Sequence, residues 1–115
     1  MKSKVLKIVE LAQERKAIDV IALDLRKTAN FCDYFVILTG TSMTHIKSIA
    51  DGINDGLRKD GIRTHHAEGY RESKWVVLDH FSVIVHVFDE NTRLFYDLEN
   101  LWADAPKLKL NLKVK

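Results

Sequence analysis

Trp75-Val76-Val77-Leu78-Asp79-His80-Phe81-Ser82-Val83-Ile84-Val85-His86-Val87-Phe88 is an almost unbroken run of β-branched and aromatic residues. Only the segment from Asp79 to Ser82 interrupts it, which predicts two strands joined by a tight turn. A two-residue turn would align three pairs across the strands: Asp79 with Ser82, Val77 with Ile84, and Trp75 with His86. Because side chains alternate along a strand, these six residues would share one face, and the aliphatic residues between them would form a core face. The mixed chemistry of the first face indicates a recognition surface.

The length and composition of the chain indicate one globular domain. Its 115 residues are 46% hydrophobic and 30% charged, which is typical of a folded protein whose core needs no disulfide or metal. The formal net charge of +2 is too small to indicate a dedicated nucleic-acid binder. The single cysteine, Cys32, cannot form an internal disulfide, and no segment resembles a membrane span or a secretion signal. We therefore expect a cytoplasmic protein that does not contact a membrane.

Hydrophobic periodicity predicts the other elements. Apolar residues recur at helical spacing in three segments: 3–16, with Ser3 as N-cap, 46–57, and 93–102, with Asn91 or Thr92 as N-cap. Strand patterns occupy three further segments: 19–25, 34–39 and, weakly, 62–65. The segment 34–39 is almost continuously apolar, so we expect both of its faces to be covered. Together these elements predict a single α+β domain with a mixed five-stranded sheet and flanking helices.

Two glycines interrupt the predicted helix at 46–57. Gly52 and Gly56 each cost about 1 kcal/mol relative to alanine in a helix interior. Close approach of this helix to the sheet would explain their presence. Gly61 lies just past the end of the helix, where a C′ residue is expected.

The chain after Pro106 has a different pattern. Residues 1–106 make up the predicted domain, and residues 107–115 alternate polar and apolar residues, as an amphipathic edge strand does. The lysines of this tail could instead contact RNA phosphates, which is the alternative interpretation.

Gly40-Thr41-Ser42 connects a predicted strand to a predicted helix. Free amide groups at such a junction can hold a phosphate with the help of the helix dipole. The lysine and the longer glycine spacing of a phosphate-binding loop are missing, so a turn with a helix cap is favoured and an anion or partner contact is the alternative. The layout is also similar to that of nucleotidyltransferases, which add paired carboxylates for Mg²⁺. Asp97 and Glu99 lie in a helical pattern, where residues two apart diverge.

Histidine and cysteine give weak signals for chemistry. Only His65 and His66 are adjacent, and no cysteine or carboxylate stands at ligand spacing beside them, so no metal or cofactor is predicted. Cys32 has no local signature of a nucleophile and is expected to be a half-buried thiol. For Trp75 and His86, packing in the core is the alternative to contact with a partner.

Several separated motifs resemble the Iojap/RsfS family of ribosomal silencing factors. In chain order they are Leu38-Thr39-Gly40-Thr41-Ser42 with His45, Trp75 to Asp79, Val83 to Phe88, and Arg93-Leu94-Phe95-Tyr96-Asp97-Leu98-Glu99-Asn100-Leu101-Trp102. The resemblance covers residues 4 to about 106 and implies a nucleotidyltransferase-like fold without the catalytic carboxylates. Phe81 departs from the family pattern, which has glycine there. An aromatic residue does not easily adopt a positive φ, so a longer turn is the alternative.

The resemblance implies a protein that is not an enzyme and that binds the large ribosomal subunit at its ribosomal protein number fourteen, with nearby rRNA as a further contact. By covering the surface that meets the small subunit, it would block subunit joining and repress translation when nutrients are scarce. A homodimer is implied for the free protein. The residues expected to contact the partner are Trp75, Val77, Asp79, Ser82, Ile84, His86, Arg93 and Tyr96. The competing hypothesis is a nucleotide-binding or nucleotidyltransferase-like enzyme that uses Gly40, Thr41 and Ser42.

Overall fold

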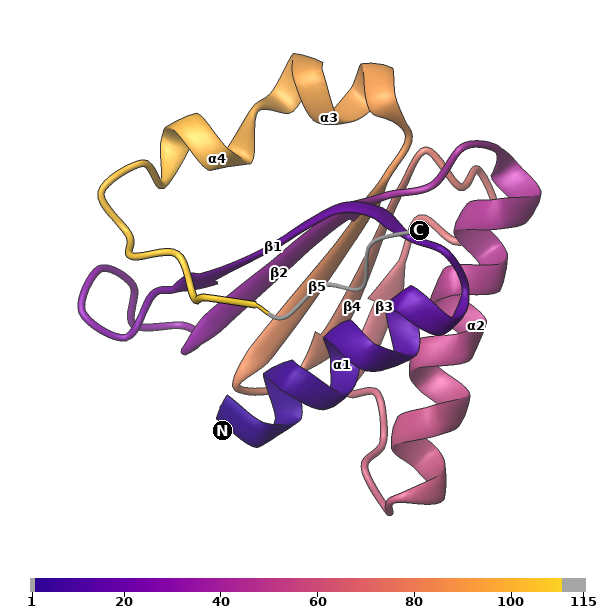
Figure 1. Ribbon diagram of the computed structural model, residues 1–115, viewed down its shortest axis with the longest axis horizontal. Helices are drawn as coiled ribbons and strands as arrows, with labels where there is room; N and C mark the ends of the chain where they lie inside the picture. Colours follow the sequence, from indigo (N-terminus) through magenta and orange to yellow (C-terminus); the bar gives the residue numbers. More distant parts are fainter. Residues whose placement is uncertain (1, 111–115) are drawn as a thin grey trace.

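The strand β2 (Tyr34–Thr39) lies inside the sheet with a neighbour on each side, and all six of its residues are buried, as predicted. A computed structural model describes residues 2–110. In it β2 pairs antiparallel with β1 (Ile18–Asp24) and parallel with β5 (Val83–Phe88). β4 (Trp75–His80) and the edge strand β3 (His66–Glu68) complete the order β1-β2-β5-β4-β3 (Figure 1). The prediction of an α+β domain with a mixed five-stranded sheet is confirmed.

Helices cover the two faces of this sheet unequally (Figure 1). The helices α1 (Lys2–Glu14) and α2 (Met43–Lys59) pack on the first face, over a core cluster that includes Val36, Leu38 and Val85. The short helices α3 (Glu90–Tyr96) and α4 (Leu98–Leu101) border the second face, whose cluster is centred on Phe35, Ile37 and Phe88. The second face therefore keeps an uncovered part. Among residues 2–110, no helix has the length and apolar character to cross a membrane.

The helices α1 and α2 are antiparallel and touch through the two glycines of α2. A Cβ atom on Gly56 would overlap the Leu11 side chain, and one on Gly52 would lie 2.8 Å from Cγ of Arg15. The glycines thus allow a close approach, but its partner is α1. The prediction that they face the sheet is wrong, because the side of α2 that meets the sheet carries the large aliphatic residues instead.

The ends of the first two helices differ in how well the sequence predicts them. α1 already includes Ser3, so Ser3 is not its N-cap, and the helix ends at Glu14, just before Lys16 adopts a φ of 63°. Gly61 occupies the predicted C′ position of α2 with a φ of 79°. Its amide donates to the Arg58 carbonyl at 2.9 Å, and the next amide, of Ile62, donates to the Leu57 carbonyl at 2.9 Å. This pair of bonds is a Schellman motif.

The hairpin β4–β5 has the predicted faces but a different register. Every pair is shifted by two residues: Trp75 aligns with Phe88, Val77 with His86, and Asp79 with Ile84. The two-residue turn is Phe81-Ser82, and Phe81 has a φ of 66° while its amide donates to the Asp79 carboxylate at 2.8 Å. The turn therefore has two residues, as first predicted, and the alternative of a longer turn is wrong. Because side chains alternate, a shift of two leaves each residue on its predicted face.

Two other segments differ from the sequence prediction. The edge strand is His66–Glu68 and not 62–65, because Ile62 packs against the core at the end of α2 and the Thr64 hydroxyl donates to Asn54 at 2.6 Å. The last helical pattern forms two helices, because Asp97 adopts the left-handed conformation (φ 48°, ψ 55°) between α3 and α4. Asp89, rather than Asn91 or Thr92, is the N-cap of α3 and accepts from the Thr92 amide at 2.7 Å.

The start of the C-terminal tail lies along β1. The Asp24 amide donates to the Pro106 carbonyl, the Leu108 amide donates to the Ala22 carbonyl, both at 2.8 Å, and Leu23 forms an isolated antiparallel bridge with Lys107. The edge strand predicted for residues 107–115 stays a prediction. Its last part, residues 111–115, lies outside the described residues.

Two histidines of the hairpin are buried, one on each face of the sheet. His80 lies beneath the α1 side, and His86 lies on the second face. Burial disfavours the charged imidazolium, so it lowers the pKa of His80 and lowers that of His86 to about 4. Both rings are therefore neutral at pH 7.

The buried His86 should make stability depend on pH. Its pKa is about 6.5 in the unfolded chain and about 4 in the folded protein, so the unfolded state binds more protons between these values. The free energy of unfolding should be highest above pH 6.5 and should fall, by something on the order of 3 kcal/mol from His86, as the pH drops to 4. Urea denaturation between pH 7 and pH 4 should show a weaker fall for His86→Phe, whereas the exposed control His66→Gln should keep the full fall. An unchanged fall in His86→Phe would contradict this origin.

Two glycines with positive φ offer a matched test of backbone packing. Gly61 (φ 79°) has open space where a Cβ would be, whereas a Cβ on Gly69 (φ 82°) would overlap the Trp75 carbonyl. Gly61→Ala should lower the free energy of unfolding by about 1 kcal/mol, the cost of left-handed backbone for alanine. Gly69→Ala should lower it by something on the order of 3 kcal/mol, because a carbonyl cannot rotate away as a side chain can. Equal losses in urea denaturation would show that Gly69 does not pack against β4 in this way.

Candidate functional site

Arg93 fixes the position of α3 on the sheet. The side chain is buried, and its Nη1 donates to the Asp19 carbonyl at 2.7 Å and to the Thr39 hydroxyl at 2.8 Å. Its Nη2 lies 3.1 Å from Oε2 of Glu99 in an ion pair. A buried guanidinium needs such complete pairing to offset its lost hydration. Arg93, which was expected to contact a partner, therefore has its donors occupied within the chain, and direct contact with a partner stays a prediction.

Rings form a continuous row across the second face of the sheet, which we call the aromatic row. Its members, in order, are Phe31, Trp102, Phe35, His86, Trp75, Tyr96 and Phe95. Neighbouring ring centroids are between 4.5 and 6.0 Å apart, within the range of favourable ring contact. Phe35 and His86 in the middle are buried, whereas Phe31 at one end and Phe95 at the other are exposed. The row thus ends in two separate apolar surfaces.

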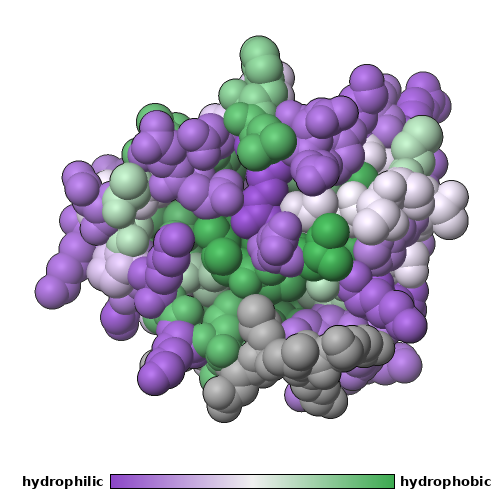
Figure 2. Space-filling model, turned by 45° about the horizontal axis from the view of Figure 1, so that its top comes forward, coloured by the Kyte–Doolittle hydropathy of each residue, from purple (hydrophilic) through white to green (hydrophobic). Residues whose placement is uncertain are grey.

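The α3 end of the aromatic row is the more apolar of the two. Phe95 is 81% exposed, and its neighbours Leu94, Tyr96 and Leu101 are exposed as well. Figure 2, which brings the α3–α4 side forward, shows hydrophobic atoms among the hydrophilic ones on this side. Monomeric proteins rarely expose large apolar side chains together, so such a group indicates a surface that another molecule covers.

The uncovered part of the second face adjoins this apolar group. Trp75, Val77, Asp79 and Ile84, four of the predicted contact residues, lie here side by side on β4 and β5, and all are half-buried. Ser82 lies half-buried in the turn, and its hydroxyl oxygen has no hydrogen-bond partner among residues 2–110. We call the surface formed by Trp75, Val77, Asp79 and Ile84, together with Leu94, Phe95, Tyr96 and Leu101, the docking surface.

His86 lies beneath the docking surface and does not form part of it. Its Nδ1 accepts a hydrogen bond from the Trp75 indole at 3.0 Å, and its ring meets Phe35 edge-on with centroids 4.5 Å apart. Its Nε2 is buried without a hydrogen-bond partner in the described part of the chain. The neutral imidazole therefore orients the indole, which is the largest group of the docking surface.

The Gly40-Thr41-Ser42 turn is occupied by the chain itself. The Gly40 amide donates to the Phe88 carbonyl at 2.9 Å, and the Thr41 amide donates to Nδ1 of His45 at 2.8 Å. Ser42 is the N-cap of α2, and its hydroxyl accepts from the His45 amide at 3.0 Å. These bonds fit the turn and helix cap that the sequence favours.

Other candidates for chemistry receive little support. Burial raises the pKa of the Cys32 thiol to about 11, so it is protonated at neutral pH and is a poor nucleophile. Within residues 2–110, no group of three or more His, Cys, Asp or Glu residues is placed to hold a metal ion. Asp97 and Glu99 are not the carboxylate pair of a nucleotidyltransferase, because Glu99 is paired with Arg93 and Asp97 caps α3 in left-handed conformation.

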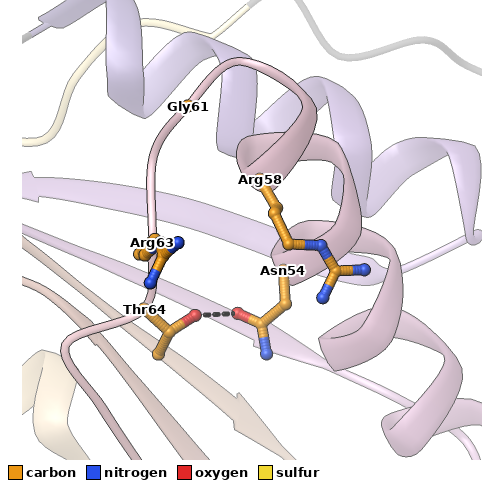
Figure 3. A pocket seen from close by; sticks show the side chains of 5 residues that line it. All are labelled: Asn54, Arg58, Gly61, Arg63 and Thr64. Carbon is orange, nitrogen blue, oxygen red and sulfur yellow. Dashed lines mark hydrogen bonds between the residues drawn. The ribbon is translucent and has the colours of Figure 1, made fainter.

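A hollow of about 600 Å³ lies where α2 ends (Figure 3). Asn54 points toward the loop that carries Arg63 and Thr64, and its hydrogen bond with Thr64 crosses between helix and loop. The guanidinium of Arg58 is paired with Asp55 at 2.7 Å. This basic corner is at the C-terminal end of a helix, whose dipole disfavours an anion. It is therefore a weaker candidate than the docking surface.

Sequence reasoning did not single out Leu94, Phe95 or Leu101 as exposed. Leu94 and Leu101 fit the periodicity of the single helix predicted over residues 93–102. The break at Asp97 turns them outward. The adjacent aromatics Phe95 and Tyr96 held the useful signal, because neighbouring residues of a helix point about 100° apart, so a helix that packs along a narrow face exposes at least one of them.

Comparison with known proteins gives the family. A family model described as "Ribosomal silencing factor during starvation" (RsfS) matches residues 1–115. A curated ribosomal silencing factor RsfS from Bacillus subtilis is 39% identical over 108 residues, which cover 93% of this chain and 92% of that protein. A crystal structure of a Bacillus halodurans protein has a TM-score of 0.86 at 31% identity and covers 96% of this chain and 100% of its own. One from Chromobacterium violaceum has a TM-score of 0.88 at 26% identity, with coverage of 98% and 93%. The chain belongs to the RsfS family of ribosomal silencing factors.

Proposed function

We propose that this protein silences translation by binding the large ribosomal subunit at its ribosomal protein number fourteen and sterically blocking the small subunit. The family name supports a role in silencing the ribosome during starvation. The exposed apolar group on α3 and α4 is the observation that carries the proposal, because a surface of this kind needs a macromolecular partner rather than a small substrate. The occupied Gly40-Thr41-Ser42 turn supports a role as a binding protein and not as an enzyme.

The docking surface has the anatomy of a protein interface. Its centre is apolar and aromatic, with Trp75, Tyr96 and Phe95 in ring contact. Asp79 and the exposed pair His66 and Glu68 on β3 lie at its margin. Aromatic anchors surrounded by a polar rim are typical of interfaces in which a few residues supply most of the binding energy. The proposed role of Arg93 is to hold α3 in place for this contact, because its donors are used within the chain.

We propose a cytoplasmic protein that is a homodimer when free and that acts when nutrients are limiting. Nearby rRNA would be a secondary contact, since the net charge of +2 supports no extended binding of nucleic acid.

Truncation of the exposed anchors should weaken binding to the large subunit. Phe95→Ala removes a side chain that is 81% exposed, so the fold should persist while affinity falls by about 2 kcal/mol, roughly thirtyfold. Trp75→Ala should lower the affinity for the large subunit by at least as much. It should also lower the free energy of unfolding, because the indole packs on Phe88 and His86. Co-sedimentation with purified large subunits measures the effect. Leu6→Ala, which truncates an exposed leucine on α1, is the control and should bind as the wild type does. Undiminished sedimentation of a folded Phe95→Ala variant would sink this assignment.

Steric occlusion should appear directly in subunit joining. Wild-type protein incubated with large subunits before the small subunits are added should reduce the peak of joined ribosomes in a sucrose gradient. Phe95→Ala should restore that peak in proportion to its lost affinity. Normal joining with wild-type protein bound to every large subunit would contradict the occlusion mechanism while leaving the binding proposal intact.

A further inference from the structure

The Phe31 end of the aromatic row borders a second hollow of about 600 Å³. Its walls are the β1–β2 loop, residues 26–31, and Trp102 just after α4. Figure 1 shows this loop, at the left, beside the chain that follows α4. The site lies at the opposite end of the aromatic row from Phe95 and Tyr96, and none of its residues belongs to the docking surface.

The apolar wall of this hollow consists of aromatic rings. Phe31 is 55% exposed in the loop, between the exposed Asn30 and the buried Cys32. Its ring centroid is 6.0 Å from that of Trp102 and 6.0 Å from that of the buried Phe35, so packing on two sides fixes its position. A phenyl ring that is held in place and open to solvent is suited to stacking with a flat ligand.

The opposite wall is polar and basic. Lys27 is exposed and forms no ion pair within residues 2–110. Arg26 is bound twice by the Asp24 carboxylate, at 2.9 and 2.7 Å, so it adds little net charge. Thr28 and Asn30 add groups that can donate and accept hydrogen bonds.

The loop is ordered by its own hydrogen bonds. The amides of Thr28 and Ala29 both donate to the Leu25 carbonyl, at 3.1 and 2.9 Å, and the Leu25 amide donates to the Asp33 carbonyl at 2.8 Å. The backbone that carries Lys27 and Phe31 is therefore ordered in the free protein, so little backbone entropy is lost when a ligand binds.

We propose that this hollow binds one unpaired nucleotide of RNA, with its base against Phe31 and Trp102 and its phosphate near Lys27. Stacking rings beside a free cation are the features by which proteins hold single-stranded nucleic acid. An acidic peptide would use Lys27 but would leave the rings without a flat partner. A single nucleotide also suits the small net charge, which an extended RNA site would not. The proposal rests on the proposed function, since the ribosome supplies the RNA.

Binding of isolated RNA tests the site without the ribosome. ¹⁵N-labelled full-length protein should be titrated at low salt with single-stranded pentauridylate, with uridine monophosphate and with a glutamate pentapeptide. Pentauridylate should shift the indole signal of Trp102 and the amides of residues 26–31, and Phe31→Ala should abolish these shifts. Shifts from the monophosphate alone would indicate a free nucleotide as the ligand. Shifts from the peptide alone, or no shift with millimolar RNA, would overturn the proposal.

Affinity for the large subunit tests the site in its proposed setting. Phe31→Ala should weaken co-sedimentation about tenfold, the usual effect of losing one stacked base, and Phe31→Trp should restore it. Lys27→Ala should lower the slope of log affinity against log salt by about one, because one phosphate contact is lost. Tyr70→Ala and Lys47→Ala are matched controls, since Lys47 lies 5.5 Å from the Tyr70 ring outside both surfaces, and both should bind normally.

Isolated ribosomal protein number fourteen separates this proposal from the proposed function. Phe31→Ala should bind that protein as tightly as the wild type, because Phe31 lies outside the docking surface. Unchanged affinity of Phe31→Ala for the whole subunit would overturn the nucleotide site while leaving the proposed function in place. Failure of the wild type to bind the subunit would instead defeat the proposed function, and the titration would then decide the nucleotide site alone.

Discussion

The buried guanidinium of Arg93 is the interaction on which the second layer of this protein depends. It reaches the Asp19 carbonyl, which β1 turns inward at a register shift between Ile18 and Ile21, where Asp19 has a φ of 50°. It also pairs with Glu99 beyond the break at Asp97. One side chain thus connects α3 to the first two strands and to α4. Removing it would leave Glu99 without its cation and would free the helices that carry the docking surface.

The alternation of side chains explains why the sequence predicts so much of the sheet. The uniform burial of β2 follows from its continuous apolar run, and the two faces of the hairpin follow from period two. The register of the hairpin cannot be predicted from this alternation, because a two-residue turn can form at His80-Phe81 or at Phe81-Ser82. In the folded protein the Asp79 carboxylate accepts from the Phe81 amide and stabilises a positive φ that phenylalanine alone disfavours. Trp75, Val77 and Asp79 keep their predicted face because the shift is an even number of residues.

The parts of the site that sequence did not predict depend on tertiary contacts. The sequence around Arg93 is typical of a surface residue. Its burial depends on the Asp19 carbonyl, which is distant in sequence and accepts its hydrogen bond in the folded protein. The periodicity of Leu94 and Leu101 is compatible with one amphipathic helix, and only the left-handed Asp97 shows that α3 and α4 are separate. Gly52 and Gly56 correctly predict that another element approaches α2 closely. A glycine does not indicate which element this is, and here it is α1.

The buried middle of the aromatic row orders the side chains that lie toward its two exposed ends. Phe35 and His86 hold Trp102 and Trp75 by ring contacts, and His86 adds a hydrogen bond to the Trp75 indole. Side chains that are already ordered lose little rotamer entropy when a partner covers them, so more of the contact energy remains as affinity. The two ends lie on one side of the sheet but share no surface residue. A protein contact at the α3 end and a nucleotide at the Phe31 end would therefore not compete, and together they would exceed the affinity of either.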